Sequence, residues 1–227
     1  MSAALARHWR DPLIIGGLLA VLGVPFVTWW STVDPVSEYF RYAVPDGQRV
    51  YLLSKLVGLY AVIGFWIQAS YGILGITWRR QLRIEWGLGF HRGLGLSVLL
   101  LAACHAMLFV AAVGMRTKHF PVQYLQISFE DGFYRSMIAL GLIALLVTLV
   151  AVIAALTRSR FGPYFRYAHW VALPAFLLAL FHSWRIGSET RMSPLSVLYL
   201  LMLLSTTGLI VMRAFWARGV PEGSQPR

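Results

Sequence analysis

The sequence predicts an all-α integral membrane protein, a bundle of six transmembrane helices with both termini in the cytoplasm. Three observations lead to this fold class. First, 58% of the 227 residues are hydrophobic and only 13% are charged, a balance that a soluble domain of this length does not have. Second, six apolar segments have the roughly 20 residues that a helix needs to cross the hydrocarbon core of a bilayer. Third, the charge between those segments alternates in sign along the chain.

The six expected helices lie at roughly 12–30, 51–76, 89–114, 134–157, 164–184 and 194–216, in a single domain over residues 1–227. The first segment follows Arg7 and Arg10, as the apolar part of a signal peptide would. It runs into Trp29 and Trp30 without a small-residue cleavage motif, so we expect it to be retained as a helix. Prolines stand at three predicted helix starts, where a missing N–H does no harm: Pro12, Pro163 and Pro194.

Arginines collect in two of the connecting loops, 77–92 and 158–166, against the single acid Glu85: Arg79, Arg80, Arg83, Arg92, Arg158, Arg160 and Arg166. The other three loops hold six acids: Asp34, Glu38, Asp46, Glu130, Asp131 and Glu189. Because basic loops stay on the cytoplasmic side, this alternation predicts that both termini lie there, in a multi-pass protein of the cell membrane. Topology signals therefore explain the net charge of +11, and membrane lipids rather than nucleic acid are the expected partners.

The chain has one cysteine, Cys104, inside an apolar segment. A single thiol excludes an internal disulfide, covalent attachment of a c-type heme, and a cysteine-held iron–sulfur or zinc site within the chain. We interpret Cys104 as a small buried apolar residue.

Four of the six histidines lie on only two expected helices, His91 and His105 on the third and His169 and His182 on the fifth. These helices run in the same direction because one antiparallel helix separates them. Spacings of 14 and 13 residues correspond to rises of roughly 21 and 20 Å, which gives an inner rung, His91 opposite His169, and an outer rung, His105 opposite His182. Histidine in a bilayer normally has a partner inside the bundle. An iron held by two facing imidazoles fits each rung, which predicts two stacked, non-covalent b-type hemes with these four histidines as ligands.

The azimuths of the histidines require one irregularity. Fourteen residues return to within about 40° of the same face of an ideal helix, which suits His91 and His105. Thirteen residues miss that face by about 140°, so His169 and His182 share a face only if their helix is kinked or bulged. Pro174 lies between them and lacks the N–H of the helical ladder, so we expect the irregularity near Pro174.

Small and basic residues beside the rungs are further candidates for the sites. Gly95, Ala102 and Ala179 lie one turn from ligand histidines and would leave room for a flat macrocycle, although small residues also serve ordinary helix packing. Arg92 and Arg166 adjoin the inner rung, where they either bind heme propionates or face lipid phosphates as topology signals. The corresponding candidates on the outer side are Lys55, Arg116, Arg135 and Arg185.

A proton or ion pathway and ordinary polar packing are the alternatives to heme for these histidines. A proton relay would need carboxylates alongside, and no Asp or Glu lies in the middle of any expected span. One zinc ion cannot be shared by residues 14 positions apart on a helix. Heme is therefore the preferred interpretation.

At these residues the sequence resembles the ferric reductase-like transmembrane domain, shared by ferric reductases, NADPH oxidases and bacterial relatives. The resembling pieces are Phe90-His91-Arg92-Gly93-Leu94-Gly95, Cys104-His105, Tyr164-Phe165-Arg166-Tyr167-Ala168-His169-Trp170 and Phe181-His182-Ser183-Trp184. The likeness covers roughly 50–217. It implies a cytochrome b-type oxidoreductase subunit whose two stacked bis-histidine hemes carry electrons from the cytoplasm to the outer face, in a bacterial inner membrane.

The family usually continues into a cytoplasmic module that binds flavin and a nicotinamide, whereas this sequence contains no Gly-rich nucleotide fingerprint. We therefore expect a separate cytoplasmic electron donor at the arginine-bearing loops, either a flavoprotein that supplies the flavin or a ferredoxin-type protein. The expected acceptor is a periplasmic protein or a small molecule near Arg116, Lys118 and His119. A small relative in the family is the stand-alone heme subunit of the bacterial methionine sulfoxide reductase system, which carries arginine at the position of His91.

Two other functions are compatible with the sequence. The outer heme could itself reduce ferric iron or oxygen, which would make the chain a terminal reductase. The chain could also be a non-redox transporter, or an assembly subunit of a larger membrane complex. No side chain is predicted to act as a catalytic acid, base or nucleophile.

Overall fold

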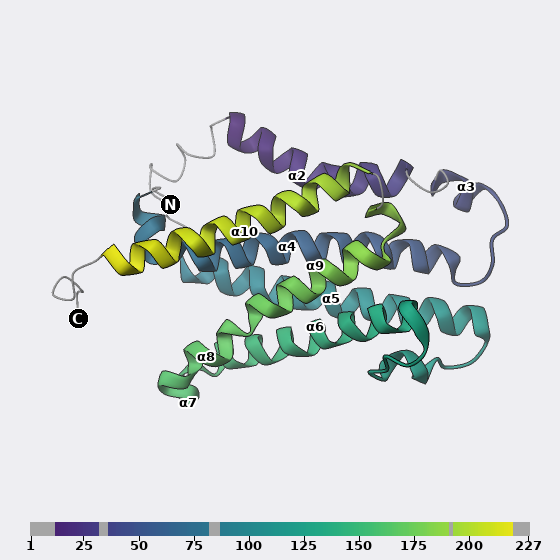
Figure 1. Ribbon diagram of the computed structural model, residues 1–227. Coiled ribbons are helices and arrows are strands. Elements are labelled where there is room, and N and C mark those ends of the chain that lie inside the picture. The colour runs from purple at the N-terminus through teal and green to yellow at the C-terminus, as the bar shows by residue number, and fades with distance from the viewer. Residues whose placement is uncertain (1–11, 32–35, 82–86, 191–192, 220–227) are drawn as a thin grey trace.

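The computed structural model describes residues 12–31, 36–81, 87–190 and 193–219, and in these ranges the chain is helical without a β-strand. The long helices are α2 (Pro12–Ser31), α4 (Gln48–Gln81), α5 (Leu88–Thr117), α6 (Gly132–Leu156), α9 (Ala172–Ile186) and α10 (Pro194–Gly219) (Figure 1). The short elements are α3 (Val36–Arg41), α7 (Arg158–Phe161), α8 (Phe165–Trp170) and the 3₁₀ turns η1 (Val122–Leu125), η2 (Gly162–Tyr164) and η3 (Ser188–Thr190).

Among the described residues, five helices are long and apolar enough to cross a membrane: Gln48–Gly75, Leu88–Thr117, Gly132–Leu156, Gly162–Ile186 and Pro194–Phe215. The first expected segment also forms a helix, α2, whose described apolar part, Leu19–Ser31, is shorter than a membrane span. Large apolar side chains cover the outside of the bundle; Leu100 and Met107 are 61% and 65% exposed, which suits lipid rather than water. These are the helix lengths and surfaces of a multi-pass membrane protein.

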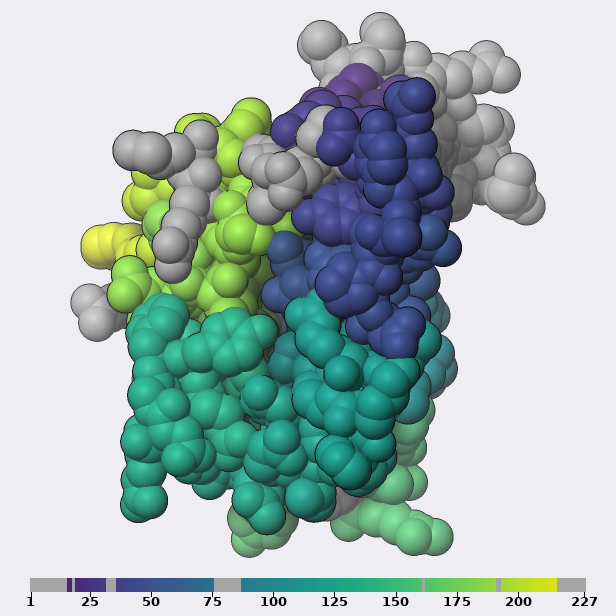
Figure 2. All heavy atoms as spheres, turned by 90° about the vertical axis from the view of Figure 1, so that its right-hand side faces the viewer, coloured from purple at the N-terminus to yellow at the C-terminus, as the bar shows by residue number. Residues whose placement is uncertain are grey.

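The helices pack as two antiparallel pairs with two further helices against one of them. α4 packs along α5, and α6 packs along α9, while α2 and α10 lie against α4. α2 begins and α10 ends at the end of the bundle where α5 begins, on the left of Figure 1. α5 and α9 run in the same direction, as expected. Figure 2 shows the opposite end of the bundle, which is formed by the start of α4, the segment after α5 and the connection from α9 to α10.

Side-chain hydrogen bonds fix α2 and α10 against α4. The indole N–H of Trp29 donates to the carbonyl of Leu52 at 2.8 Å, and that of Trp66 donates to the Ser205 hydroxyl at 3.0 Å. Lipid tails are as apolar as leucine, so packing and such hydrogen bonds carry helix association in a bilayer.

The buried core separates the two histidine levels. Val98 lies midway between the histidines of α5, and Phe176 lies between those of the fifth expected helix; both are at most 2% exposed. The ring of Phe65 packs edge-on against Phe176, with centroids 5.6 Å apart. The buried hydroxyl of Tyr199 shares a 2.7 Å hydrogen bond with Ser183, so this phenol brings no unpaired polar group into the core.

α4 is interrupted at Gly75, whose backbone has φ 62° and ψ 178°. The break frees main-chain carbonyls in the turn before it, and Arg213 of α10 satisfies them. Its guanidinium donates to the carbonyl of Ile73 at 3.0 Å and to that of Gly72 at 3.4 Å. The sequence did not point to Arg213, because the break that needs it depends on one glycine dihedral angle.

The irregularity expected near Pro174 is present. The fifth expected helix is divided into α8, which ends at Trp170, and α9, which begins at Ala172. Proline has no N–H for the carbonyl four residues earlier, and its ring clashes with that carbonyl, which here belongs to Trp170. The helix is therefore interrupted at Val171, between His169 and His182, and the expected irregularity near Pro174 is confirmed.

Replacement of Gly75 by alanine is expected to destabilise the protein by about 1–3 kcal/mol, because only glycine adopts this backbone region without strain. Thermal unfolding of the purified protein in detergent would measure the loss. Gly93→Ala is the control, since a Cβ at Gly93 also meets nothing within 4 Å but lies in a regular stretch of α5. Equal unfolding temperatures for the two variants would contradict the assignment of strain to Gly75.

Candidate functional site

The four histidines on α5, α8 and α9 meet as two pairs. The ring centroids of His91 and His169 are 5.9 Å apart, with their planes at 79°. The centroids of His105 and His182 are 6.4 Å apart, with their planes at 67°. The structure thus brings together the same partners that helix direction and spacing predicted, one pair toward each end of the bundle.

The two separations leave space for one metal ion between each pair of rings. A metal lies about 2 Å from an imidazole nitrogen that binds it, and the ring centre lies about 1 Å behind that nitrogen. Two imidazoles on one metal therefore have centres about 6 Å apart. The measured separations of 5.9 and 6.4 Å agree with this value. The centroid separation of each pair is therefore compatible with two imidazoles that hold one iron.

Three of the four imidazoles place Nδ1 against a main-chain carbonyl of the helix that packs behind them. The Nδ1–oxygen distances are 2.8 Å from His105 to Ser54 on α4, 2.5 Å from His182 to Met137 on α6, and 3.4 Å from His169 to Ala151 on α6. An imidazole that donates from Nδ1 keeps its lone pair on Nε2. A histidine in this tautomer can bind a metal through Nε2. The Nδ1 contact to a carbonyl is also the second hydrogen bond that metal-binding histidines usually make.

Glycines on α4 and α6, the helices that pack behind the histidines, leave two of these carbonyls accessible to the rings. A helical side chain leans toward the N-terminus and covers the turn before its own Cα. Gly58 and Gly141 lie four residues after Ser54 and Met137, so no side chain covers the carbonyls there. A Cβ at Gly58 would lie 2.8 Å from Nδ1 of His105, and a Cβ at Gly141 would lie 2.7 Å from Cε1 of His182. The close approach of both outer rings therefore depends on glycine.

α4 repeats this arrangement at the inner rung. Gln68 and Gly72 follow Ser54 and Gly58 by 14 residues, which is also the spacing of the two histidines on α5. A Cβ at Gly72 would lie 3.4 Å from Cε1 of His91. The sequence analysis missed this repeat because it appears only when α4 is known to face the histidines.

The inner rung differs in the group that meets its α5 histidine. The side-chain amide of Gln68 donates to the main-chain carbonyl of His91 at 2.9 Å, and its nitrogen lies 3.3 Å from Nε2 of the same residue. Gly95, expected to leave room for a macrocycle, instead leaves room for this amide, since a Cβ there would lie 2.9 Å from Gln68 Nε2. Tyr71 stacks on His91 with ring centroids 5.8 Å apart.

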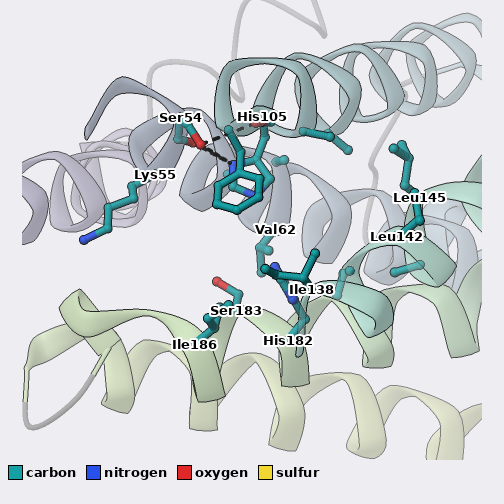
Figure 3. A pocket seen from close by; sticks show the side chains of 18 of the residues that line it. Ser54, Lys55, Val62, His105, Ile138, Leu142, Leu145, His182, Ser183 and Ile186 are labelled. Atoms are coloured by element: carbon teal, nitrogen blue, oxygen red, sulfur yellow. Dashed lines mark hydrogen bonds between the residues drawn. The ribbon is translucent and has the colours of Figure 1, made fainter. Parts of the chain in front are cut away.

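A cavity that is partly open to the outside adjoins the outer rung between α4, α5, α6 and α9. His105 and His182 line it, and so do Ala102 and Ala179, the small residues that the sequence placed one turn from them. Figure 3 shows Ser54 and His105 on one side of the cavity and His182 on the other. The remaining wall is largely aliphatic and aromatic, as is usual where a flat organic cofactor binds.

A buried ion pair lies in the wall of the same cavity. Lys55 of α4 bonds to the carboxylate of Glu189 and donates to the hydroxyl of Ser188 at 2.7 Å. Glu189 is only 4% exposed, although the sequence placed it among the acids of an external loop. A buried carboxylate needs a hydrogen-bonded cation of this kind.

The other basic candidates lie elsewhere. Arg92 and Arg166 are exposed, and neither makes an ion pair or hydrogen bond to another described residue. On the outer side, Lys55 lines the cavity, whereas the remaining three bind other groups: Arg116 bonds to Gln48, Arg135 bonds to Asp131 at 3.1 Å, and Arg185 lies over the ring of Phe133. The side chains of Arg79, Arg80 and Arg83 lie outside the described residues. The propionate-binding role of Arg92 and Arg166 is still a prediction.

Within the described ranges, no group of three or more His, Cys, Asp and Glu side chains comes together to hold a metal ion. No protein-family model, curated protein sequence or solved structure matches the chain. The resemblance to ferric reductase-like domains accordingly rests on the residues quoted above.

Replacement of Gly141 by alanine is expected to destabilise the protein by about 1–3 kcal/mol, because the new methyl group would overlap the ring of His182 and force it to move. Thermal unfolding in detergent would show the loss. Gly208→Ala serves as control, since its Cβ would meet nothing within 4 Å. An unfolding temperature for Gly141→Ala at or above that of the control would show that the ring does not depend on this glycine.

Proposed function

We propose that this chain is a transmembrane electron-transfer protein that holds two b-type hemes, one at each histidine pair. The observation that carries the proposal is the presence of two imidazole pairs whose centres are 5.9 and 6.4 Å apart. The Nδ1 contacts of three of the rings and the cavity at the outer pair support it. Heme, when bound, supplies one-electron redox chemistry at its iron.

Under this proposal the protein's residues hold, insulate and orient the cofactors. His91 and His169 would hold the inner iron, and His105 and His182 would hold the outer one. Because each iron would already be held by two imidazoles, an acceptor would receive electrons without binding to the iron. The core around Val98 and Phe176 keeps water out of the space between the two sites. Electrons would pass from the inner site to the outer site over the roughly 21 Å that separates the α5 histidines.

The proposed orientation places the arginine-bearing end of the bundle in the cytoplasm, with α2 as a sixth span and both termini on that side. Arg92, Arg158, Arg160 and Arg166 are exposed at this end. They suit an acidic donor such as a flavoprotein or a ferredoxin-type protein. The acceptor, a protein or a small molecule, would approach the opposite end, toward which the cavity beside the outer pair lies. The partly open cavity also suits direct reduction of a ferric chelate or oxygen by the outer heme, which is the second candidate function.

The purified full-length protein is expected to contain two b hemes per chain, measured by a pyridine hemochrome assay and a reduced-minus-oxidised spectrum. His105→Leu and His169→Leu should each retain one heme, because each removes one ligand of one pair. His119→Leu, at an exposed position outside the pairs, should retain both. A well-folded wild-type sample without heme would overturn the proposal.

The orientation can be tested by cysteine labelling in a Cys104→Ala background. Gln126→Cys and Ser159→Cys place exposed thiols at opposite ends of the bundle. A membrane-impermeant maleimide should label the thiol at 126 in intact cells and the thiol at 159 only after lysis. The reverse pattern would place the arginine-bearing end outside.

A further inference from the structure

We infer that α4 supplies one positioning residue to each heme, Ser54 to the outer heme and Gln68 to the inner heme. The inference rests on the proposed function, and it concerns residues that neither the histidine pattern nor the family resemblance indicates. Neither residue would touch the iron. Each would act through the imidazole that does.

Ser54 contacts His105 in three ways. Its main-chain oxygen lies 2.8 Å from Nδ1, its hydroxyl lies 3.2 Å from the same nitrogen, and the hydroxyl also donates to the His105 carbonyl at 3.4 Å. Ser54 is 1% exposed, so water does not compete for these contacts. Because Gly58 leaves the ring free to approach, α4 determines where the outer imidazole lies.

Gln68 occupies the equivalent place at the inner rung. Its amide nitrogen donates to the His91 carbonyl at 2.9 Å and lies 3.3 Å from Nε2 of the ring, beside the nitrogen that would hold the iron rather than behind it. Its side-chain oxygen is buried without a hydrogen-bond partner among the described residues. A buried amide oxygen without a donor is costly, so its retention beside the histidine pair favours a role in the site.

The two contacts follow from one helix register. α4 and α5 are antiparallel, and 14 residues separate both Ser54 from Gln68 and His91 from His105. The same face of α4 therefore meets the same face of α5 at both levels. A main-chain carbonyl and a short hydroxyl meet the ring at the outer level, whereas a flexible side-chain amide meets it at the inner level.

Hydrogen bonds to an axial imidazole change the electron density that the ring gives to the iron and fix the orientation of its plane. Ser54 would thus affect the outer heme through Nδ1 of His105, and Gln68 would affect the inner heme by holding the main chain of His91 and lying beside its ring. Loss of Gln68 should have the larger effect, because it removes both of these contacts of the amide. Removal of the Ser54 hydroxyl leaves the main-chain carbonyl at His105 in place.

The test uses the full-length holoprotein in detergent, with Gln68→Met and Ser54→Ala as the variants. A potentiometric titration followed by absorption spectroscopy reports one step for each heme, and the single-heme proteins His169→Leu and His105→Leu assign the steps. Electron paramagnetic resonance of the ferric protein reports the angle between the imidazole planes at each iron. Ser70→Ala is the matched control, because its buried hydroxyl on the same helix has no hydrogen-bond partner among the described residues.

Gln68→Met is expected to shift the potential and the resonance signal of the inner heme, or to release that heme alone. Ser54→Ala should shift the outer heme by a smaller amount, and Ser70→Ala should shift neither. Equal shifts of both hemes, no shift in Gln68→Met, or loss of both hemes would overturn the inference. Absence of heme from the wild-type protein would instead count against the proposed function, so the two failures are distinguishable.

Discussion

An imidazole buried in a membrane bundle needs a hydrogen-bond partner, and for three of the four rings the structure meets this need with helix carbonyls. A main-chain carbonyl that already accepts the helical N–H has a second lone pair. That lone pair is accessible only where the residue one turn later has little or no side chain, as Gly58 and Gly141 show. Each histidine-bearing helix is therefore backed by an antiparallel helix that offers small residues and carbonyls, and this requirement pairs α4 with α5 and α6 with α9.

The same requirement accounts for the kink. On α6 the two accepting carbonyls, those of Met137 and Ala151, are 14 residues apart, whereas the histidines that reach them are 13 apart. A regular helix would place those histidines on different faces. The interruption at Val171, which Pro174 imposes, lets both rings reach α6 and also face the histidines of α5. The proline is thus a condition for the second pair rather than a local defect.

Sequence patterns predicted the helices, the pairing of the histidines and the kink, because each depends on properties of single segments: apolar length, residue spacing and a missing N–H. They did not predict Ser54, Gln68, the burial of Glu189 or the role of Arg213. These depend on which face of one helix meets another, and a glycine in a membrane helix looks the same whether it faces lipid or a ring. On α4 a polar residue with a glycine four positions later occurs twice, 14 residues apart, at Ser54 and Gln68. This spacing equals that of the histidines on α5, and it is a signal that could have predicted the α4 contacts.

Under the proposed function, the two sites arise from one packing arrangement used twice, and their difference has a consequence. Identical sites would give equal potentials apart from the effect of burial, and an electron would occupy the two hemes equally. The inner site has a side-chain amide where the outer site has a main-chain carbonyl, and the wall of the outer cavity also contains the Lys55–Glu189 pair. Both differences act on electrostatics close to the ligands, where small changes alter a redox potential. A repeated frame with unequal polar partners would therefore give the two hemes unequal potentials, and this difference would set how an electron divides between them.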